Sequence, residues 1–121
     1  MAEDLKNIIK EGWLEKESKY LKQWRSRWFV LTSNSIYSFK DQKIYKGPTE
    51  VIPLSTITTI KSTDDETSKE NSFKIELSDR RFYMAAPTNL EKELWIGAVG
   101  KAMVKKTLQS KNAVPEGEDF D

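Results

Sequence analysis

The chain has 121 residues, of which 37% are hydrophobic and 32% are charged, so it forms one domain with a modest apolar core and a solvated surface. Its formal net charge of +1 predicts no partner by itself, and it contains neither cysteine nor histidine. These absences exclude disulfides, thiol nucleophiles, imidazole catalysis and the metal sites that need such ligands. We therefore expect no catalytic residue, no metal and no cofactor, and we predict that the chain is not an enzyme.

Positive charge is concentrated in the first third of the chain. Between Lys6 and Lys46, ten basic residues stand against four acidic ones, a net charge of +6, and the remainder carries −5. A basic segment favours an anionic partner, although scattered lysines also simply solvate strands and loops. No apolar run is long enough to span a bilayer, and the acidic start Met1–Asp4 lacks the pattern of a secretory signal. We therefore expect a cytoplasmic protein whose contact with any membrane is peripheral.

The hydrophobic pattern predicts seven strands after a polar segment, 1–7, that we expect to be flexible. Alternation of apolar and polar residues, with turn-forming residues between the runs, is typical of antiparallel strands. The predicted strands are 8–16, 25–32, 36–40, 51–54, 57–61, 73–77 and 82–84.

From residue 90 the hydrophobic period becomes that of a helix. One apolar stripe is formed by Leu90, Leu94, Trp95, Ala98, Val99, Ala102 and Met103. Thr88 followed by Glu91 fits a capping box at the start of this helix. Residues 108–121 are polar and acidic, which predicts a disordered tail. The domain therefore spans 8–107, and its fold class is mainly β: a bent antiparallel sheet or barrel capped by one C-terminal α-helix.

Strand parity places two arginines on the core side of the sheet. Arg25 and Arg27 share a face with Phe29 and Leu31 in the strand 25–32. If the apolar pair packs in the core, both guanidinium groups point inward at the first end of the strand. An unpaired guanidinium inside a core is costly, so this end of the sheet must open to water or to an anion.

Two lysines are predicted to join these arginines. If 13–16 and 25–31 pair as a hairpin, Lys16 lies beside both guanidinium groups, and Lys40 closes the next strand, which returns to the same end. Such a group forms a clamp for a polyphosphate, because arginine offers a planar fork to phosphate oxygens and lysine a mobile charge. The alternative is an internal ion-pair network of these cations with Glu15, Glu17 or Asp41.

The loop between these two strands carries an apolar pair at a predicted turn. Tyr20 and Leu21 stand between Lys19 and Lys22. This pattern suits a membrane-contacting loop, with shallow insertion of the apolar residues beside anionic headgroups. The alternative is that both residues fold back onto the sheet.

The segments Glu11–Leu14 and Trp24–Leu31 resemble a pleckstrin homology domain, most like those of the protein kinase B type and of small single-domain proteins. The resemblance covers roughly residues 8–106 and includes Glu91–Trp95, the helical segment that carries a tryptophan. It implies a seven-stranded, strongly bent sheet capped by a C-terminal helix. It also implies that the open end of the sheet binds inositol phosphates.

The resemblance also implies site residues. Lys16, Arg25 and Arg27 match the basic motif of lipid-binding members, and Arg80 matches a further phosphate contact. Ser38 stands where some members selective for 3-phosphorylated inositides carry a tyrosine. We therefore expect a monomer that binds phosphoinositide headgroups on a membrane surface and binds no nucleic acid. The alternative is an adaptor that uses the same fold to bind a protein partner without specific lipid binding.

Overall fold

The computed structural model describes residues 4–20 and 22–118, of which 110–118 are described by their backbone alone. Seven strands form one antiparallel sheet in the order β4-β3-β2-β1-β7-β6-β5, followed by one C-terminal helix, as predicted for this mainly β fold. The elements in chain order are η1 (Asp4–Lys6), β1 (Ile8–Glu17), β2 (Trp24–Thr32), β3 (Ser35–Phe39), β4 (Glu50–Pro53), η2 (Leu54–Thr56), β5 (Ile57–Ser62), β6 (Ser72–Leu77), β7 (Arg81–Ala85) and α1 (Asn89–Glu118).

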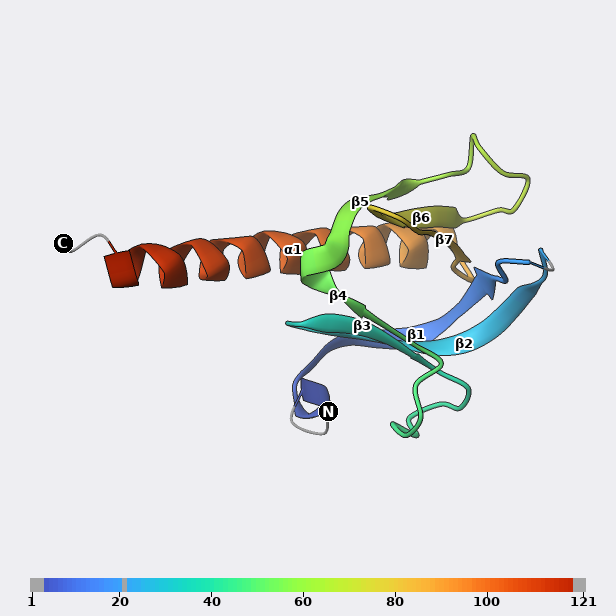
Figure 1. Ribbon diagram of the computed structural model, residues 1–121. Helices are drawn as coiled ribbons and strands as arrows, with labels where there is room; N and C mark the ends of the chain where they lie inside the picture. Colours follow the sequence, from blue (N-terminus) through green and yellow to red (C-terminus); the bar gives the residue numbers. More distant parts are fainter. Residues whose placement is uncertain (1–3, 21, 119–121) are drawn as a thin grey trace.

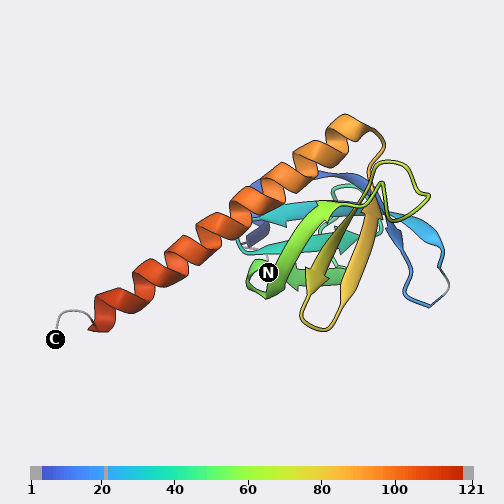
Figure 2. The same ribbon diagram turned by 90° about the horizontal axis from the view of Figure 1, so that it is seen from above.

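The sheet divides into two layers at β1. This strand pairs with β2 along its whole length, but it pairs with β7 only through Glu15 and Lys16 near its C-terminal end. Strands β1–β4 therefore form one layer and β5–β7 the other, with α1 covering one side and projecting beyond both (Figures 1 and 2). The layers remain joined where β1 ends, and this places the loops that follow β1 and β3 at a shared end of the sheet.

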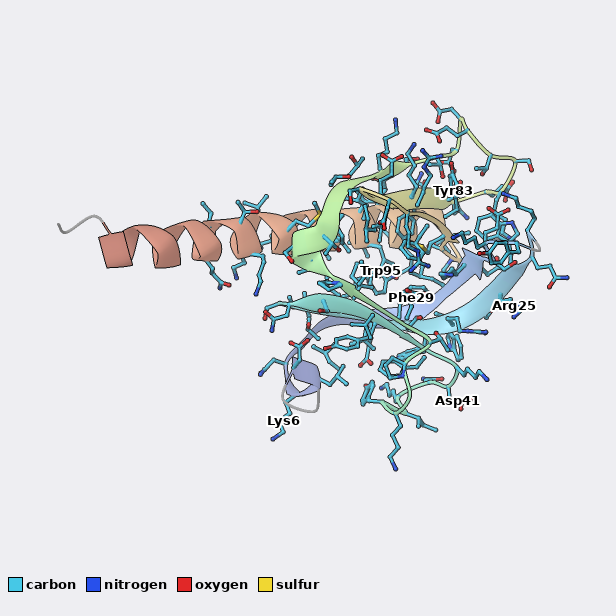
Figure 3. The ribbon with its side chains drawn as sticks, in the orientation of Figure 1. Lys6, Arg25, Phe29, Asp41, Tyr83 and Trp95 are labelled. Atoms are coloured by element: carbon cyan, nitrogen blue, oxygen red, sulfur yellow. The ribbon has the colours of Figure 1, made fainter. Side chains whose placement is uncertain are left out.

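The main core lies between the two layers and α1. Alternating residues of the strands face inward, as the period of two predicts for a half-buried sheet. Trp95 of α1 is 2% exposed and packs with these side chains (Figure 3). The same core cluster includes Leu14, Phe29, Leu31, Ile36, Ile52, Phe73, Ile75, Phe82, Met84 and Val99.

A second, smaller cluster covers the outer face of β2 and β3. Its members are Leu5, Trp28, Val30, Tyr37 and Phe39. Leu5 belongs to η1, whose Asp4 accepts hydrogen bonds from the side chains of Thr32 (2.7 Å), Asn34 (3.0 Å) and Tyr37 (2.6 Å). Residues 4–7, which the sequence analysis assigns to a flexible segment, are thus held on the sheet, because they bury apolar surface and satisfy three hydroxyl and amide groups.

Helix α1 differs from the predicted helix in its exposed face and in its length. Thr88 caps it through a hydrogen bond from the backbone N–H of Glu91 to Thr88 Oγ1 (3.1 Å). Leu90 and Leu94 are 67% and 47% exposed, so the predicted stripe is too wide. At 100° per residue these two leucines lie roughly 140° and 100° around the helix from Trp95, which marks the core-facing side.

The same helix continues to Glu118, into the segment 108–121 for which the sequence predicts disorder. Among the described residues, no helix combines the length and the apolar character needed to cross a membrane.

Candidate functional site

A pocket of about 200 Å³ opens where the β1–β2 loop meets the end of β3 and the start of β4. The residues that line it are Lys16, Ser18, Arg25, Arg27, Ser38, Thr49 and Glu50. Three of the cations that the sequence proposes are therefore gathered in one place, while the polar and acidic residues on the opposite wall come from β3, β4 and the loop between them.

The register of the β1–β2 hairpin brings the cations together. Lys16 lies directly opposite Arg25, and Leu14 lies opposite Arg27. Phe29, two residues further along β2 from Arg27, is 2% exposed and lies in the core between the layers (Figure 3). Because side chains two residues apart on a strand share a face, both arginines extend this core face beyond the core, to the open end of the sheet.

Neither guanidinium group is neutralised by a carboxylate within the part of the chain that the structure describes. Arg25 Nη2 donates to Gln23 Oε1 (3.3 Å), and Arg27 Nη1 donates to the backbone carbonyl of Ser26 (2.8 Å). Both acceptors are uncharged, so each arginine keeps its full positive charge and several free donors. Gln23 also closes the loop, since its backbone N–H donates to Ser18 Oγ (3.1 Å) at the edge of the pocket.

The predicted alternative, an internal network with acidic residues of the same region, is not formed. Glu15 pairs with Lys69 of the β5–β6 loop (2.8 Å), outside the pocket. Among the described residues, Glu17 and Asp41 make no ion pair with the pocket cations, and Asp41 is exposed on the β3–β4 loop (Figure 3). The two arginines therefore line an open pocket without forming an ion pair to any of these three acidic residues.

The side chain of Lys16 is partly buried. Its Nζ lies 5.2 Å from the ring centroid of Phe82 on β7. Burial lowers the pKa of Lys16 and nearby Arg80 and Arg27 lower it further, while the charge of Glu50 opposes the shift. The net lowering means that the folded protein disfavours the charged ammonium, as expected for a site built to receive an anion.

Lys40 and Arg80, the other two predicted phosphate-binding residues, do not line this pocket. Lys40 follows the last residue of β3, is exposed and does not line the pocket, because strand pairing ends at Phe39. Arg80 is also outside the lining, but its guanidinium stacks 4.4 Å from the Phe82 ring that Lys16 contacts, and its Nη1 bonds to Glu50 (3.0 Å). Arg80 is thus an immediate neighbour of the site, whereas Lys40 is not part of it.

Three residues that were not predicted for the site, Ser18, Thr49 and Glu50, also line the pocket. Glu50 carries a pattern that identifies it: it stands two residues before Ile52, which is 3% exposed in the core, so the rule that locates the arginines also turns Glu50 inward. Ser38 pairs with Glu50 across β3 and β4, and the hydroxyls of Ser38 and Thr49 are 2.6 Å apart. Within the described residues, no group of three or more acidic side chains is arranged to hold a metal ion.

The β1–β2 loop projects next to the pocket. Tyr20 is 83% exposed, and Lys19 Nζ lies 5.3 Å from its ring centroid. The alternative in which Tyr20 folds back onto the sheet is therefore wrong. Lys22 is exposed and adopts a left-handed backbone conformation (φ 56°), while Leu21, the other apolar residue predicted to contact a membrane, lies outside the described residues.

Fold and site together define a small β module: a bent seven-stranded sheet with one capping helix and a cationic pocket at its open end. The sequence model of the PH domain matches residues 8–104. The chain belongs to the pleckstrin homology domain family.

The proteins to which the chain is similar include both short and long sequences. The chain is 33% identical to pleckstrin homology domain-containing protein 1 of Arabidopsis thaliana, over 95% of this chain and 79% of that protein. It is 31% identical to a mouse dual adapter for phosphotyrosine and 3-phosphoinositide, over 91% of this chain but only 37% of the adapter. Among solved structures, the C-terminal PH domain of pleckstrin in complex with D-myo-Ins(1,2,3,5,6)P5 matches with a TM-score of 0.69 and 29% identity, over 79% of this chain and 95% of that one.

Proposed function

We propose that this protein binds a phosphoinositide headgroup in the pocket of Lys16, Arg25 and Arg27 and is thereby recruited to a membrane surface. One observation carries the proposal: three cations converge on an open pocket, and the two arginines have no carboxylate partner among the described residues. The pleckstrin domain that binds an inositol pentakisphosphate supports the ligand class, as does the adapter named for a 3-phosphoinositide.

The arrangement of the three cations suits adjacent phosphate groups. Arg25 and Arg27 stand two residues apart on the same face of β2, and Lys16 is paired across from Arg25. Each guanidinium can donate two parallel hydrogen bonds to one phosphate, and the ammonium adds a point charge between them. Each charge-assisted hydrogen bond contributes about 1.5–3 kcal/mol, so the arginines dominate the expected affinity.

Polar groups on the opposite wall supply neutral contacts. Ser38 and Thr49 present hydroxyls to the pocket from this wall and Ser18 does so from the β1–β2 loop, and hydroxyls both donate and accept, as the hydroxyls of an inositol ring do. A ring held between the cations and this wall is thereby oriented. Ser38 stands where the resemblance places a tyrosine in some selective members, and its hydroxyl lies 2.6 Å from that of Thr49.

Membrane contact is completed by the β1–β2 loop beside the pocket. Tyr20 is exposed at the tip of this loop and is flanked by Lys19 and Lys22. An exposed tyrosine between lysines places its ring at the headgroup boundary, while each lysine near an anionic surface contributes about 1 kcal/mol. The pocket would provide specificity and the loop would add affinity that depends on the bilayer.

The experiment compares the wild type with Arg27→Ala in two assays. Calorimetric titration with soluble inositol phosphates measures the pocket alone. Co-sedimentation with vesicles that each carry one phosphoinositide or phosphatidic acid measures recruitment. Loss of two charge-assisted hydrogen bonds predicts at least a tenfold fall in affinity in both assays (about 1.4 kcal/mol).

Arg81→Ala is the matched control. This residue has the same charge and lies on β7, but its Nε bonds to Glu76 (2.9 Å) outside the pocket. Saturable binding to particular headgroups that Arg27→Ala alone abolishes would support the proposal. Equal, salt-sensitive binding of all anionic vesicles by both variants would reduce the pocket to a general basic surface. Absence of binding by the folded wild type would instead favour the protein-adaptor function.

A further inference from the structure

One carboxylate stands among the cations of the pocket. Glu50 is the acidic residue in the described lining, and its side chain is 23% exposed. It projects from the first position of β4, opposite Ser38 on β3. A carboxylate in this position is unfavourable for a site whose ligand carries several negative charges, because like charges in a partly desolvated pocket repel strongly.

Glu50 also determines where Arg80 lies. Arg80 Nη1 donates to Glu50 Oε2 (3.0 Å), and the same guanidinium stacks on the Phe82 ring at 4.4 Å. Arg80 is 41% exposed in its side chain and lies outside the pocket lining, although it neighbours Lys16. The ion pair therefore holds a cation at the rim, where part of its charge is cancelled before any ligand arrives.

The charge of Glu50 reaches the pocket cations directly. Burial, with Arg80 and Arg27, lowers the pKa of Lys16, and Glu50 acts against this shift. Because Glu50 lines the same pocket as Lys16, a phosphate bound between them would be repelled by the charge that favours the ammonium. Glu50 thus stabilises the empty, cation-rich pocket and disfavours its anionic ligand.

We propose that Glu50 is a selectivity residue that discriminates against highly phosphorylated headgroups, by repelling their added phosphates and by retaining Arg80 in an ion pair. This inference rests on the proposed function and assigns to the same site a preference that the three cations alone would not produce. Repulsion grows with each added phosphate charge, so the penalty is smallest for headgroups with few phosphates.

The test is Glu50→Gln, which keeps the size of the side chain and removes its charge. Calorimetric titrations use inositol bisphosphate and inositol hexakisphosphate as the two probes. We expect the affinity for the hexakisphosphate to rise about tenfold and that for the bisphosphate about threefold or less. A uniform rise for both probes, or no rise, would overturn the proposal.

Glu70→Gln is the matched control, since it makes the same change of charge on the exposed β5–β6 loop, where Glu70 borders a separate hollow. Its affinities should stay within twofold of the wild type. Thermal unfolding of each variant establishes that the fold is intact. If Glu70→Gln gave the same gain as Glu50→Gln, net charge would explain the effect and the assignment of Glu50 would fail.

A double variant tests the role of Arg80. Arg80→Ala should cost at least threefold more affinity for the hexakisphosphate in the Glu50→Gln background than in the wild type, because Arg80 becomes available to phosphate only when the ion pair is absent. An equal cost in both backgrounds would overturn the retention of Arg80. If neither the wild type nor Glu50→Gln bound any inositol phosphate, the proposed function itself would fail. Binding by the wild type without a change in Glu50→Gln would refute only the selectivity role.

Discussion

Replacement of Lys16 by methionine is expected to stabilise the fold while it weakens binding of anions. Lys16 lies directly opposite Arg25 in the β1–β2 ladder, and like charges in directly opposed cross-strand positions are destabilising. Partial burial and the charges of Arg80 and Arg27 add to this cost, as the lowered pKa of Lys16 indicates. Methionine keeps most of the aliphatic stem and introduces no charge.

The gain in stability is reduced because the substitution removes one favourable contact of Lys16. Lys16 Nζ lies 5.2 Å from the Phe82 ring, and a cation–π contact at a partly exposed site contributes about 0.5–1 kcal/mol. Because apolar burial of the methionine side chain compensates for the lost contact, we expect a small net stabilisation by Lys16→Met, up to about 0.5 kcal/mol. The stabilisation produced by Lys16→Met depends on pH. A lowered pKa in the folded state makes the charged ammonium destabilising at every pH below its ordinary value of 10.5, and this cost disappears above that value.

Urea unfolding at pH 7 measures this difference, since urea leaves the ionic strength unchanged. The gain should appear at low salt and shrink at high salt, because salt screens the repulsion among the cations. Lys101→Met on the exposed face of α1 is the control and should change stability by less than the experimental error. A Lys16→Met variant that is less stable than the wild type at low salt would refute the view that the empty pocket is electrostatically strained.

The remaining predictions concern the N-terminal turn and the β1–β2 loop. Burial raises the pKa of Asp4, but hydrogen bonds from Tyr37, Thr32 and Asn34 outweigh it and leave the pKa lowered. The stability supplied by this carboxylate is therefore present above its ordinary pKa of 3.8 and is lost as the pH falls below it. Asp4→Asn should cost about 1 kcal/mol in urea unfolding at pH 7, with a smaller difference at pH 3, and an unchanged difference would contradict this account. Tyr20→Ser should weaken vesicle binding about threefold and leave calorimetric binding of soluble inositol phosphates unchanged; a parallel loss in both assays would place Tyr20 in the pocket instead.

The alternation of apolar and polar residues in the sequence is sufficient to predict the fold and the three cations of the pocket. Alternation places Arg25 and Arg27 on the face of Phe29, and the antiparallel pairing of two adjacent strands then brings Lys16 opposite Arg25. Such contacts depend only on the period of a strand and on a short connection, so they can be worked out without tertiary structure. The same reasoning does not reveal that Lys40 lies beyond Phe39, the last residue of β3, and outside the residues that line the pocket.

Other features depend on segments that are distant in the chain. Asp4 is held by residues of β2 and β3, and Glu50 bonds to Arg80 thirty positions away. Strand alternation with Ile52 predicts the face on which Glu50 lies. Alternation does not predict that Arg80 is the partner of Glu50, because no local period relates β4 to the β6–β7 turn.

The sequence by itself determines the seven-stranded fold and the convergence of the three cations, because both follow from strand period and hairpin pairing. Only the tertiary structure decides which charges remain unpaired in the pocket. Glu15 lies opposite Ser26 on the other face of the hairpin and pairs there with Lys69, whereas Glu50, distant in sequence, lines the pocket and forms an ion pair with Arg80. The physical reason is that electrostatic pairing depends on distance in space, which the bend of the sheet between β1 and β7 sets.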